Sequence, residues 1–112
     1  MKTLLLEILR NSLRDVNAYL KDESKREELL QNISSYLNTI RELKENTTHK
    51  ERTILVECEQ AIIHGSFLIV RDGWKSFRSK KQAKRVANRN IRGAIFWTKL
   101  LKDKPKRGEM YE

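Results

Sequence analysis

Apolar residues recur at steps of three and four through most of the chain, and this spacing restricts the fold more than any other feature. Residues at these steps lie on one face of an α-helix. Four segments show the pattern; the first begins near Lys2 and ends near Leu20, and the fourth begins at Ser76 or Ser79 and ends near Lys102. The residues expected to face the interior are Leu5, Ile8, Leu9, Leu13, Val16 and Leu20 in the first segment, Leu30, Ile33, Leu37 and Ile40 in the second, Leu55, Cys58, Ile62 and Ile69 in the third, and Ala83, Val86, Ala87, Ile91, Ala94, Ile95, Trp97 and Leu101 in the fourth.

Start and stop signals separate these segments. Ser24 and Glu27, and again Thr48 and Glu51, have the spacing of a capping box, in which two side chains satisfy free backbone N–H groups of the first turn. Asp72-Gly73 predicts the end of the third helix, with Gly73 in the left-handed conformation.

The composition agrees with helices that pack through narrow apolar stripes and expose the rest of their surface. Only 38% of the 112 residues are hydrophobic, whereas 35% are charged, and the chain has one proline and four glycines. We therefore predict an all-α protein, a small four-helix, mainly antiparallel bundle over residues 1–103 with a basic C-terminal helix, followed by a polar tail (104–112) that frays. The second and third helices are expected to supply most of the core, and a homodimer is possible. Phe67–Val70 is favoured as helix, although its residue types also suit a strand.

The positive charge is concentrated in the last third of the sequence. Met1 to Val70 contain ten basic and eleven acidic residues, whereas Arg71 to Arg107 contain fourteen basic and two acidic residues, within a formal net charge of +9. On a helix, Lys81, Lys84 and Arg92 fall on one side, with Arg85 beside them. Like charges three or four residues apart on a helix repel each other, and phosphate groups that neutralise them can relieve this repulsion.

The charge pattern predicts a non-catalytic nucleic-acid-binding accessory or regulatory protein. Candidate contact residues are Lys81, Lys84, Arg85, Arg89, Arg92, Arg78 and Trp74. Two alternatives stay open: the basic helix docks on an acidic protein, or the chain sequesters small phosphate-bearing nucleotides. A basic helix can also be an ordinary solvated face. Phe96 and Trp97 are expected in the core, and Trp74 either packs or contacts a base.

The sequence offers no recognisable catalytic or metal-binding pattern. A single cysteine, Cys58, excludes an intramolecular disulfide and a cysteine-rich zinc site, and suits a reducing cytoplasm. Cys58 is expected to be a small buried residue, His64 an interior histidine and His49 a solvated one. We therefore predict no enzyme activity, cofactor or metal. We also predict no membrane partner, because no apolar run approaches the ~20 residues of a membrane span.

Parts of the fourth segment are similar to two known motifs. Lys81 to Leu101 fits a helix-turn-helix loosely but lacks the expected turn residue. The stretch from Ala87 to Trp97 resembles the last helix of small phage proteins that sequester cyclic oligonucleotide signals. The resemblance covers this one helix, implies a phosphate-bearing ligand, and assigns no binding residue.

Overall fold

The computed structural model describes residues 1–101, and within this range every regular element is helical. The elements are α1 (Lys2–Lys21), the 3-10 turn η1 (Glu23–Lys25), α2 (Arg26–Glu45), α3 (His49–Ile62), the π-helical turn η2 (Ile63–Phe67), α4 (Leu68–Asp72), the 3-10 turn η3 (Trp74–Ser76) and α5 (Lys80–Lys99). Because α3, η2 and α4 follow one another without a break, residues 1–101 form four long helices. The prediction of a small all-α bundle is confirmed; the predicted tail lies outside the described residues.

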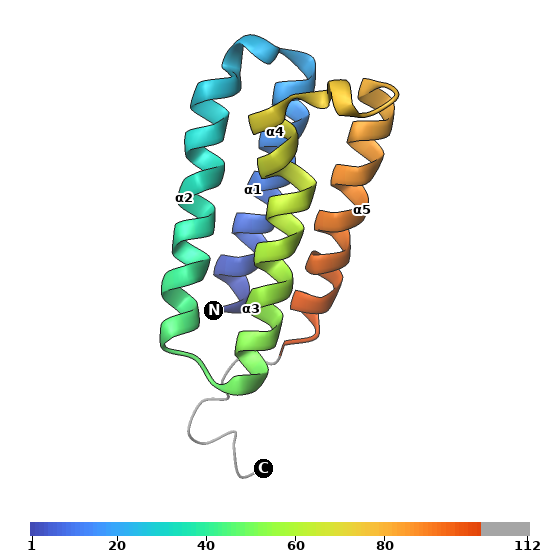
Figure 1. Cartoon of the computed structure of the whole chain (residues 1–112). Helices are drawn as coiled ribbons and strands as arrows, with labels where there is room; N and C mark the ends of the chain where they lie inside the picture. Colours follow the sequence, from blue (N-terminus) through green and yellow to red (C-terminus); the bar gives the residue numbers. More distant parts are fainter. Residues whose placement is uncertain (102–112) are drawn as a thin grey trace.

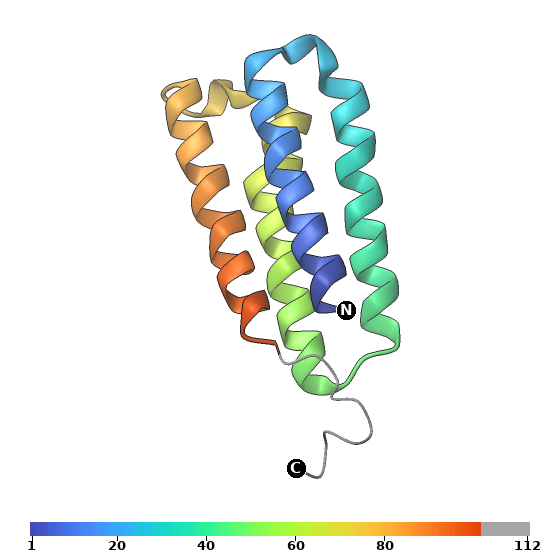
Figure 2. The same cartoon turned by 180° about the vertical axis from the view of Figure 1, so that it is seen from behind.

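The four long helices alternate in direction. In Figure 1, α1 and the α3–α4 helix run upward, whereas α2 and α5 run downward. Both α1 and α3 pack against α2 on one flank and α5 on the other. Figure 2 shows α1 lying between α2 and α5. With α1 on one flank and α3 on the other, α5 keeps its remaining side free.

Every long helix contributes to the core. The prediction that the second and third helices supply most of it is wrong, because α1 and α5 bury complete stripes of their own. The buried apolar residues are Leu5, Ile8, Leu9, Val16, Tyr19 and Leu20 of α1, Leu29, Ile33, Leu37 and Ile40 of α2, Leu55, Cys58, Ala61, Ile62, Ile69 and Val70 of the α3–α4 helix, and Ala83, Ala87, Ile91 and Ala94 of α5. Each fully buried leucine or isoleucine stabilises the fold by about 1.5–3 kcal/mol.

The turn between α1 and α2 is capped by an aspartate. Oδ1 of Asp22 accepts hydrogen bonds from the backbone N–H of Ser24 (3.1 Å) and from its hydroxyl (2.5 Å). The predicted capping box of Ser24 and Glu27 is therefore wrong, because the serine hydroxyl is a donor to the stronger carboxylate acceptor. Glu27 still lies in the first turn of α2, where its negative charge interacts favourably with the helix dipole.

The start of α3 agrees with its sequence signal. The Thr48 hydroxyl accepts from the backbone N–H of Glu51 (3.4 Å), and the Glu51 carboxylate accepts from the backbone N–H of Thr48 (3.4 Å). The predicted capping box is confirmed.

The α3–α4 helix contains one wide turn. The backbone N–H of Leu68 donates to the carbonyl of Ile63, the i→i+5 bond of a π-helix. The buried Ser66 hydroxyl donates to the Ile62 carbonyl (2.8 Å). A Cβ at Gly65 would lie 2.8 Å from Cγ1 of Ile91, so the glycine allows α5 to approach this turn. Phe67–Val70 is helical, as favoured, and not a strand.

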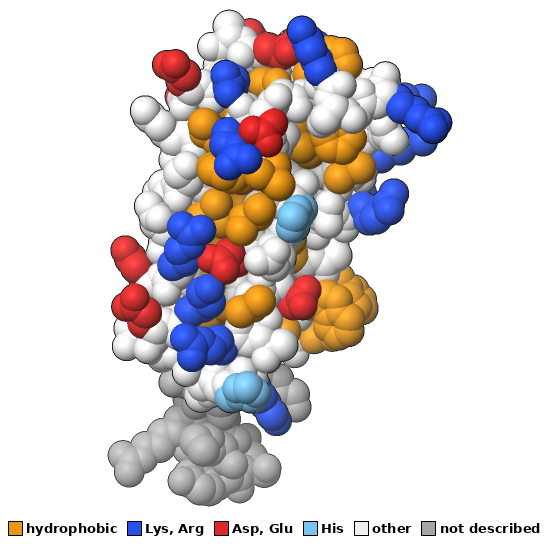
Figure 3. Space-filling view, in the orientation of Figure 1, with side chains coloured by type: hydrophobic (Ala, Val, Ile, Leu, Met, Phe, Trp, Pro, Cys, Tyr) orange, Lys and Arg blue, Asp and Glu red, His pale blue; other side chains and the backbone are white. Residues whose placement is uncertain are grey.

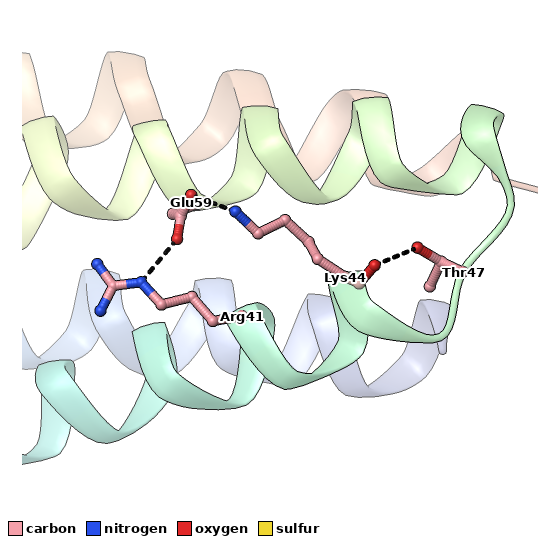
Figure 4. Close-up of polar contacts among 4 residues, drawn as sticks. All are labelled: Arg41, Lys44, Thr47 and Glu59. Atoms are coloured by element: carbon pink, nitrogen blue, oxygen red, sulfur yellow. Dashed lines mark hydrogen bonds and ion pairs between the residues drawn. The ribbon is translucent and has the colours of Figure 1, made fainter.

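One buried carboxylate joins α2 and α3. Glu59 is 8% exposed, and its two oxygens accept hydrogen bonds from Nε of Arg41 (3.0 Å) and Nζ of Lys44 (2.8 Å), as Figure 4 shows. The Thr47 hydroxyl donates to the Lys44 carbonyl (3.3 Å) at the end of α2. Burial alone would raise the pKa of Glu59, but the bonds from Lys44 and Arg41 and their charges hold it below its usual value.

The chain leaves the α3–α4 helix at Gly73. Its φ of 87° is positive, as predicted, but its ψ of 163° is extended and lies outside the left-handed helical region. Arg26 of α2 donates from Nε to the Val70 carbonyl (3.0 Å) and from its guanidinium to the Arg71 carbonyl. These bonds satisfy carbonyls that the end of a helix leaves free, and tie α2 to this corner.

Candidate nucleic-acid interface

The start of α5 is fixed by two side chains. The Ser79 hydroxyl accepts from the backbone N–H of Gln82 (3.1 Å), and the Gln82 amide oxygen accepts from the backbone N–H of Arg78 (2.6 Å). Of the two starts that the sequence allowed, Ser79 is the correct one. The second bond ties the backbone of Arg78 to the first turn of α5.

Small residues form the inner side of α5. Ala83, Ala87, Ile91 and Ala94 are buried as predicted, and Thr98, which was not predicted, is buried with them. The distance between packed helices depends on the side chains at their contact, so alanines let α5 lie close to its neighbours. Val86, Ile95 and Leu101 are half-buried. The unbroken helix from Lys80 to Lys99 leaves no turn for a helix-turn-helix within it.

The predicted cationic contact residues all lie exposed on or next to α5. Within residues 1–101, none of them forms an ion pair with a carboxylate. Figure 3 shows basic side chains along the edge that α5 forms, whereas basic and acidic side chains mix over α2 and α3. We call these residues the basic face: Lys81, Lys84, Arg85, Arg89 and Arg92 of α5 with Arg78 before it.

The basic face extends around the top of α5 toward α1. A hollow of about 240 Å³ between the two helices is lined by Lys21 of α1 and by Lys80, Lys81 and Lys84. A second hollow, of about 310 Å³, is lined by Arg78, Lys81 and Arg85 among others. Lys81 lines both, so the cationic surface is continuous here. Sequence reasoning missed Lys21; its signal was topological, since in an up-and-down bundle the first helix ends where the fourth begins.

Trp74 is held by internal contacts. Its indole N–H donates to Oε1 of Glu23 (3.0 Å), and Nζ of Lys80 lies 5.6 Å from its ring centroid and 3.4 Å from Oε2 of Glu23. The ring is half-buried against the core. Of the two roles considered for Trp74, these contacts fit packing. A contact with a base stays a prediction for this residue.

Phe96 and Trp97 are exposed, so the prediction that they belong to the core is wrong. Their exposed fractions are 59% and 53%, and Leu100 beside them is 58% exposed. The inner side of α5 at this level is occupied by Ala94 and Thr98, which turns both aromatic rings outward. The rings pack edge to face with centroids 5.6 Å apart. Figure 3 shows this apolar cluster projecting from the lower part of α5.

The titratable residues Cys58, His64 and His49 of the third segment differ in their exposure to solvent. Cys58 is buried as predicted; burial raises the pKa of its thiol, against the effect of the Thr98 hydroxyl 3.3 Å away. His64 was expected in the interior but is exposed, with Nε2 3.2 Å from Oε1 of Gln60. His49 is exposed. In the described part of the chain, no three His, Cys, Asp or Glu side chains lie together where they could hold a metal ion.

The helix His49–Asp72 is long and apolar enough, by length and composition alone, to cross a membrane. No such segment was expected from the sequence. Half of its most apolar stretch is buried inside the bundle. Leu55 and Ile62 face the core, and Glu59 binds Arg41 and Lys44 of α2. These are the properties of a core helix in a bundle.

Comparison of the chain with protein-family models, with curated proteins and with solved structures found no match. The resemblance of Ala87 to Trp97 to a phage protein helix therefore stays a resemblance over one helix.

Proposed function

We propose that this protein is a non-catalytic accessory or regulatory protein that binds nucleic acid through its basic face. The observation that carries the proposal is the group of exposed cations on one side of α5 that lack a counter-charge within residues 1–101. Like charges at helical spacing cost a few tenths of a kcal/mol per pair in the free protein. A phosphate backbone removes this repulsion and releases its own counterions.

The length of the basic face limits how many phosphates it can contact. Lys81 and Arg92 are separated by about 16 Å along the helix axis, at ~1.5 Å per residue. One nucleic-acid strand presents about five phosphates over that distance. Contacts to phosphates position a protein without reading sequence, so binding is expected to be insensitive to sequence.

The salt dependence of binding tests this proposal. With about five phosphate contacts, affinity for a short DNA or RNA should fall by about 10²–10³-fold between about 50 and 200 mM salt. Fluorescence anisotropy with a labelled oligonucleotide measures this directly. Binding that does not change over this range would contradict the proposal.

A matched pair of variants locates the site. Lys81→Gln/Arg85→Gln removes one lysine and one arginine from the basic face, and Lys50→Gln/Arg52→Gln removes the same two types from exposed positions of α3. We expect the first variant to flatten the slope of log affinity against log salt by about 2 units. The second should lie close to wild type. Equal losses would show a response to net charge alone and would reject α5 as the site.

A second candidate function is supported by the apolar cluster at the end of α5. Aromatic and arginine side chains are enriched in protein interfaces, and the exposed Phe96 and Trp97 follow Arg89 and Arg92 within about two turns of α5. An acidic partner protein would then bind here, with the charges mainly raising the association rate. Capture of partners from a nuclease-treated lysate separates the candidates: a single acidic protein favours this one, and loss of all partners favours nucleic acid.

A further inference from the structure

Gly93 lies in the middle of α5 without a packing reason. A Cβ at this position would meet no atom within 4 Å, and Gly73 is the positive-φ glycine of the described chain. Glycine is among the least favourable residues in a helix interior. Gly65 is different, because the close approach of Ile91 requires it. Gly93 thus weakens α5 and leaves a space on the surface.

That space opens onto a hollow between α3 and α5, which Gly93 helps to line. Arg89 and Trp97 lie one turn before and one turn after Gly93 on the same side of α5, at steps of four residues. The opposite wall includes Glu57 and Gln60 of α3 and His64 of the π-helical turn η2. The hollow has a volume of about 220 Å³. An aromatic ring therefore stands at one end of an open groove and a guanidinium at the other.

The basic face leads directly to this aromatic end. Arg85, Arg89, Arg92 and Phe96 follow one another at steps of four, three and four residues, so they form one line along the outside of α5. Phe96 packs edge to face on Trp97, with 76° between the two rings. The indole is thus supported by a neighbouring ring and is still 53% exposed.

We propose that this groove accepts a base of a single-stranded nucleic acid, which stacks on Trp97 over Gly93 while its backbone follows Arg89 and Arg92. Glu57 in the opposite wall disfavours a phosphate inside the groove, so the base enters and the phosphate stays on the outer line of arginines. Stacking on an aromatic ring tolerates any base. Bases in a duplex are already stacked and cannot reach the groove. This inference rests on the proposed function and adds a preference for single strands.

Trp97 itself can report the contact. The chain has two tryptophans, so Trp74→Phe leaves Trp97 as the sole indole. A single-stranded oligonucleotide of about ten nucleotides should quench its fluorescence. A hairpin duplex with the same number of phosphates should bind through the basic face with little quenching. Equal quenching by both would overturn the inference.

Substitutions at the groove separate stacking from charge. Trp97→Ala should weaken single-strand binding by roughly 5- to 150-fold and leave duplex binding and the salt slope unchanged. Trp97→Phe, which keeps a ring, should recover most of the affinity. Gly93→Leu fills the groove with a good helix former, so it should lose single-strand preference without unfolding.

Three further outcomes would contradict the inference. If Trp97→Ala binds single strands like wild type while Lys81→Gln/Arg85→Gln does not, the basic face binds nucleic acid without base stacking, and only this inference fails. If neither single strands nor duplexes bind the wild type, the proposed function fails as well. If Trp97→Ala converts a dimer to a monomer in analytical ultracentrifugation, the aromatic cluster contacts a second copy of the chain.

Discussion

The hydroxyl of Tyr36 on α2 donates a hydrogen bond of 2.7 Å to Oδ2 of Asp15 on α1, whose side chain is buried. Nε of Arg14 lies 3.6 Å from the other carboxylate oxygen. Burial of Tyr36, then the hydrogen bond to Asp15 and the charge of its carboxylate, raise the pKa of Tyr36 to about 12. The phenol therefore stays protonated and keeps donating at neutral pH.

Replacing Tyr36 with phenylalanine should destabilise the fold. Tyr36→Phe leaves the buried carboxylate of Asp15 without its donor from α2, so the free energy of unfolding at pH 7 should fall by about 1–3 kcal/mol. Urea denaturation measures this loss. Asp15→Asn in the Tyr36→Phe background removes the unsatisfied charge and should recover part of the stability. Unchanged stability in Tyr36→Phe would mean that water satisfies Asp15 equally well.

The same pair should affect stability in alkali. Because the pKa of Tyr36 is higher in the folded chain, its contribution is complete below the unfolded pKa near ~10 and is lost as pH rises through about 12. The ultraviolet difference spectrum between wild type and Tyr36→Phe should show this phenol ionising near pH 12. A phenol that ionises near pH ~10 would contradict the hydrogen bond from Tyr36 to Asp15.

Glu59 should make the bundle sensitive to acid. Its pKa is lowered in the folded chain, so its stabilisation is present above the unfolded pKa of ~4.3 and is lost as pH falls through the folded value. Glu59→Gln should cost about 1–3 kcal/mol at pH 7, and the difference from wild type should shrink below about pH 4. Glu57→Gln removes the same charge from an exposed, unpaired position and should change stability by less than about 0.5 kcal/mol. Equal losses in both variants would reject the role of the α2–α3 contact.

The two helical glycines should respond to alanine with opposite signs. Gly93→Ala meets open space and should raise the free energy of unfolding by up to about 1 kcal/mol. Gly65→Ala brings its Cβ to 2.8 Å from Ile91 and 3.1 Å from Asn90, and should lower stability by about 1–3 kcal/mol. Thermal unfolding of both variants tests the pair. Adding Ile91→Val to Gly65→Ala should recover part of the loss, because it removes a methyl group from the crowded side.

Cys58 should be unreactive until the chain unfolds. Its thiol is fully buried and burial raises its pKa, so little thiolate is accessible at neutral pH. Because Cys58 is the one cysteine of the sequence, a thiol reagent reports on this position alone. We expect slow labelling of the native protein and fast labelling in urea. Labelling at the same rate in both conditions would show that α3 and α5 separate readily.

Local signals in the sequence predicted the elements that depend on nearby residues. Thr48 and Glu51 contact each other across one turn, so their spacing was enough to predict the capping box. The positive φ of Gly73 could be predicted from the residue type, because glycine adopts this conformation without a steric cost. Most of the stripes of α1 and α2 likewise follow from helical period alone, although Leu13 and Leu30 are only half-buried and Leu29 is buried in place of Leu30. The capping box predicted at Ser24 does not form, because the carboxylate of Asp22, two residues earlier, is a better acceptor and binds the Ser24 hydroxyl.

The residues whose burial or surface was predicted wrongly are those whose environment depends on which neighbouring helix packs against them. Trp97 has the spacing of an inner residue, but the close packing of Ala94 and Thr98 leaves no room for an indole. His64 lies in an apolar stretch, yet its side of the α3–α4 helix is open to solvent. Lys21 joins the basic surface through the bundle topology and not through sequence distance. The exposed cations of α5 could be named from the sequence; the aromatic groove beside them could not.

The π-helical turn at Ile63–Phe67 holds one residue more than an α-helical turn would. In a regular helix, losing one residue rotates everything that follows by about 100° and exposes a buried face. Here, the loss of one residue within the wide turn would restore a regular helix and leave Leu55 and Ile69 facing the same side as before. The helix His49–Asp72 can therefore vary in length at this single point, and shortened variants there should still fold.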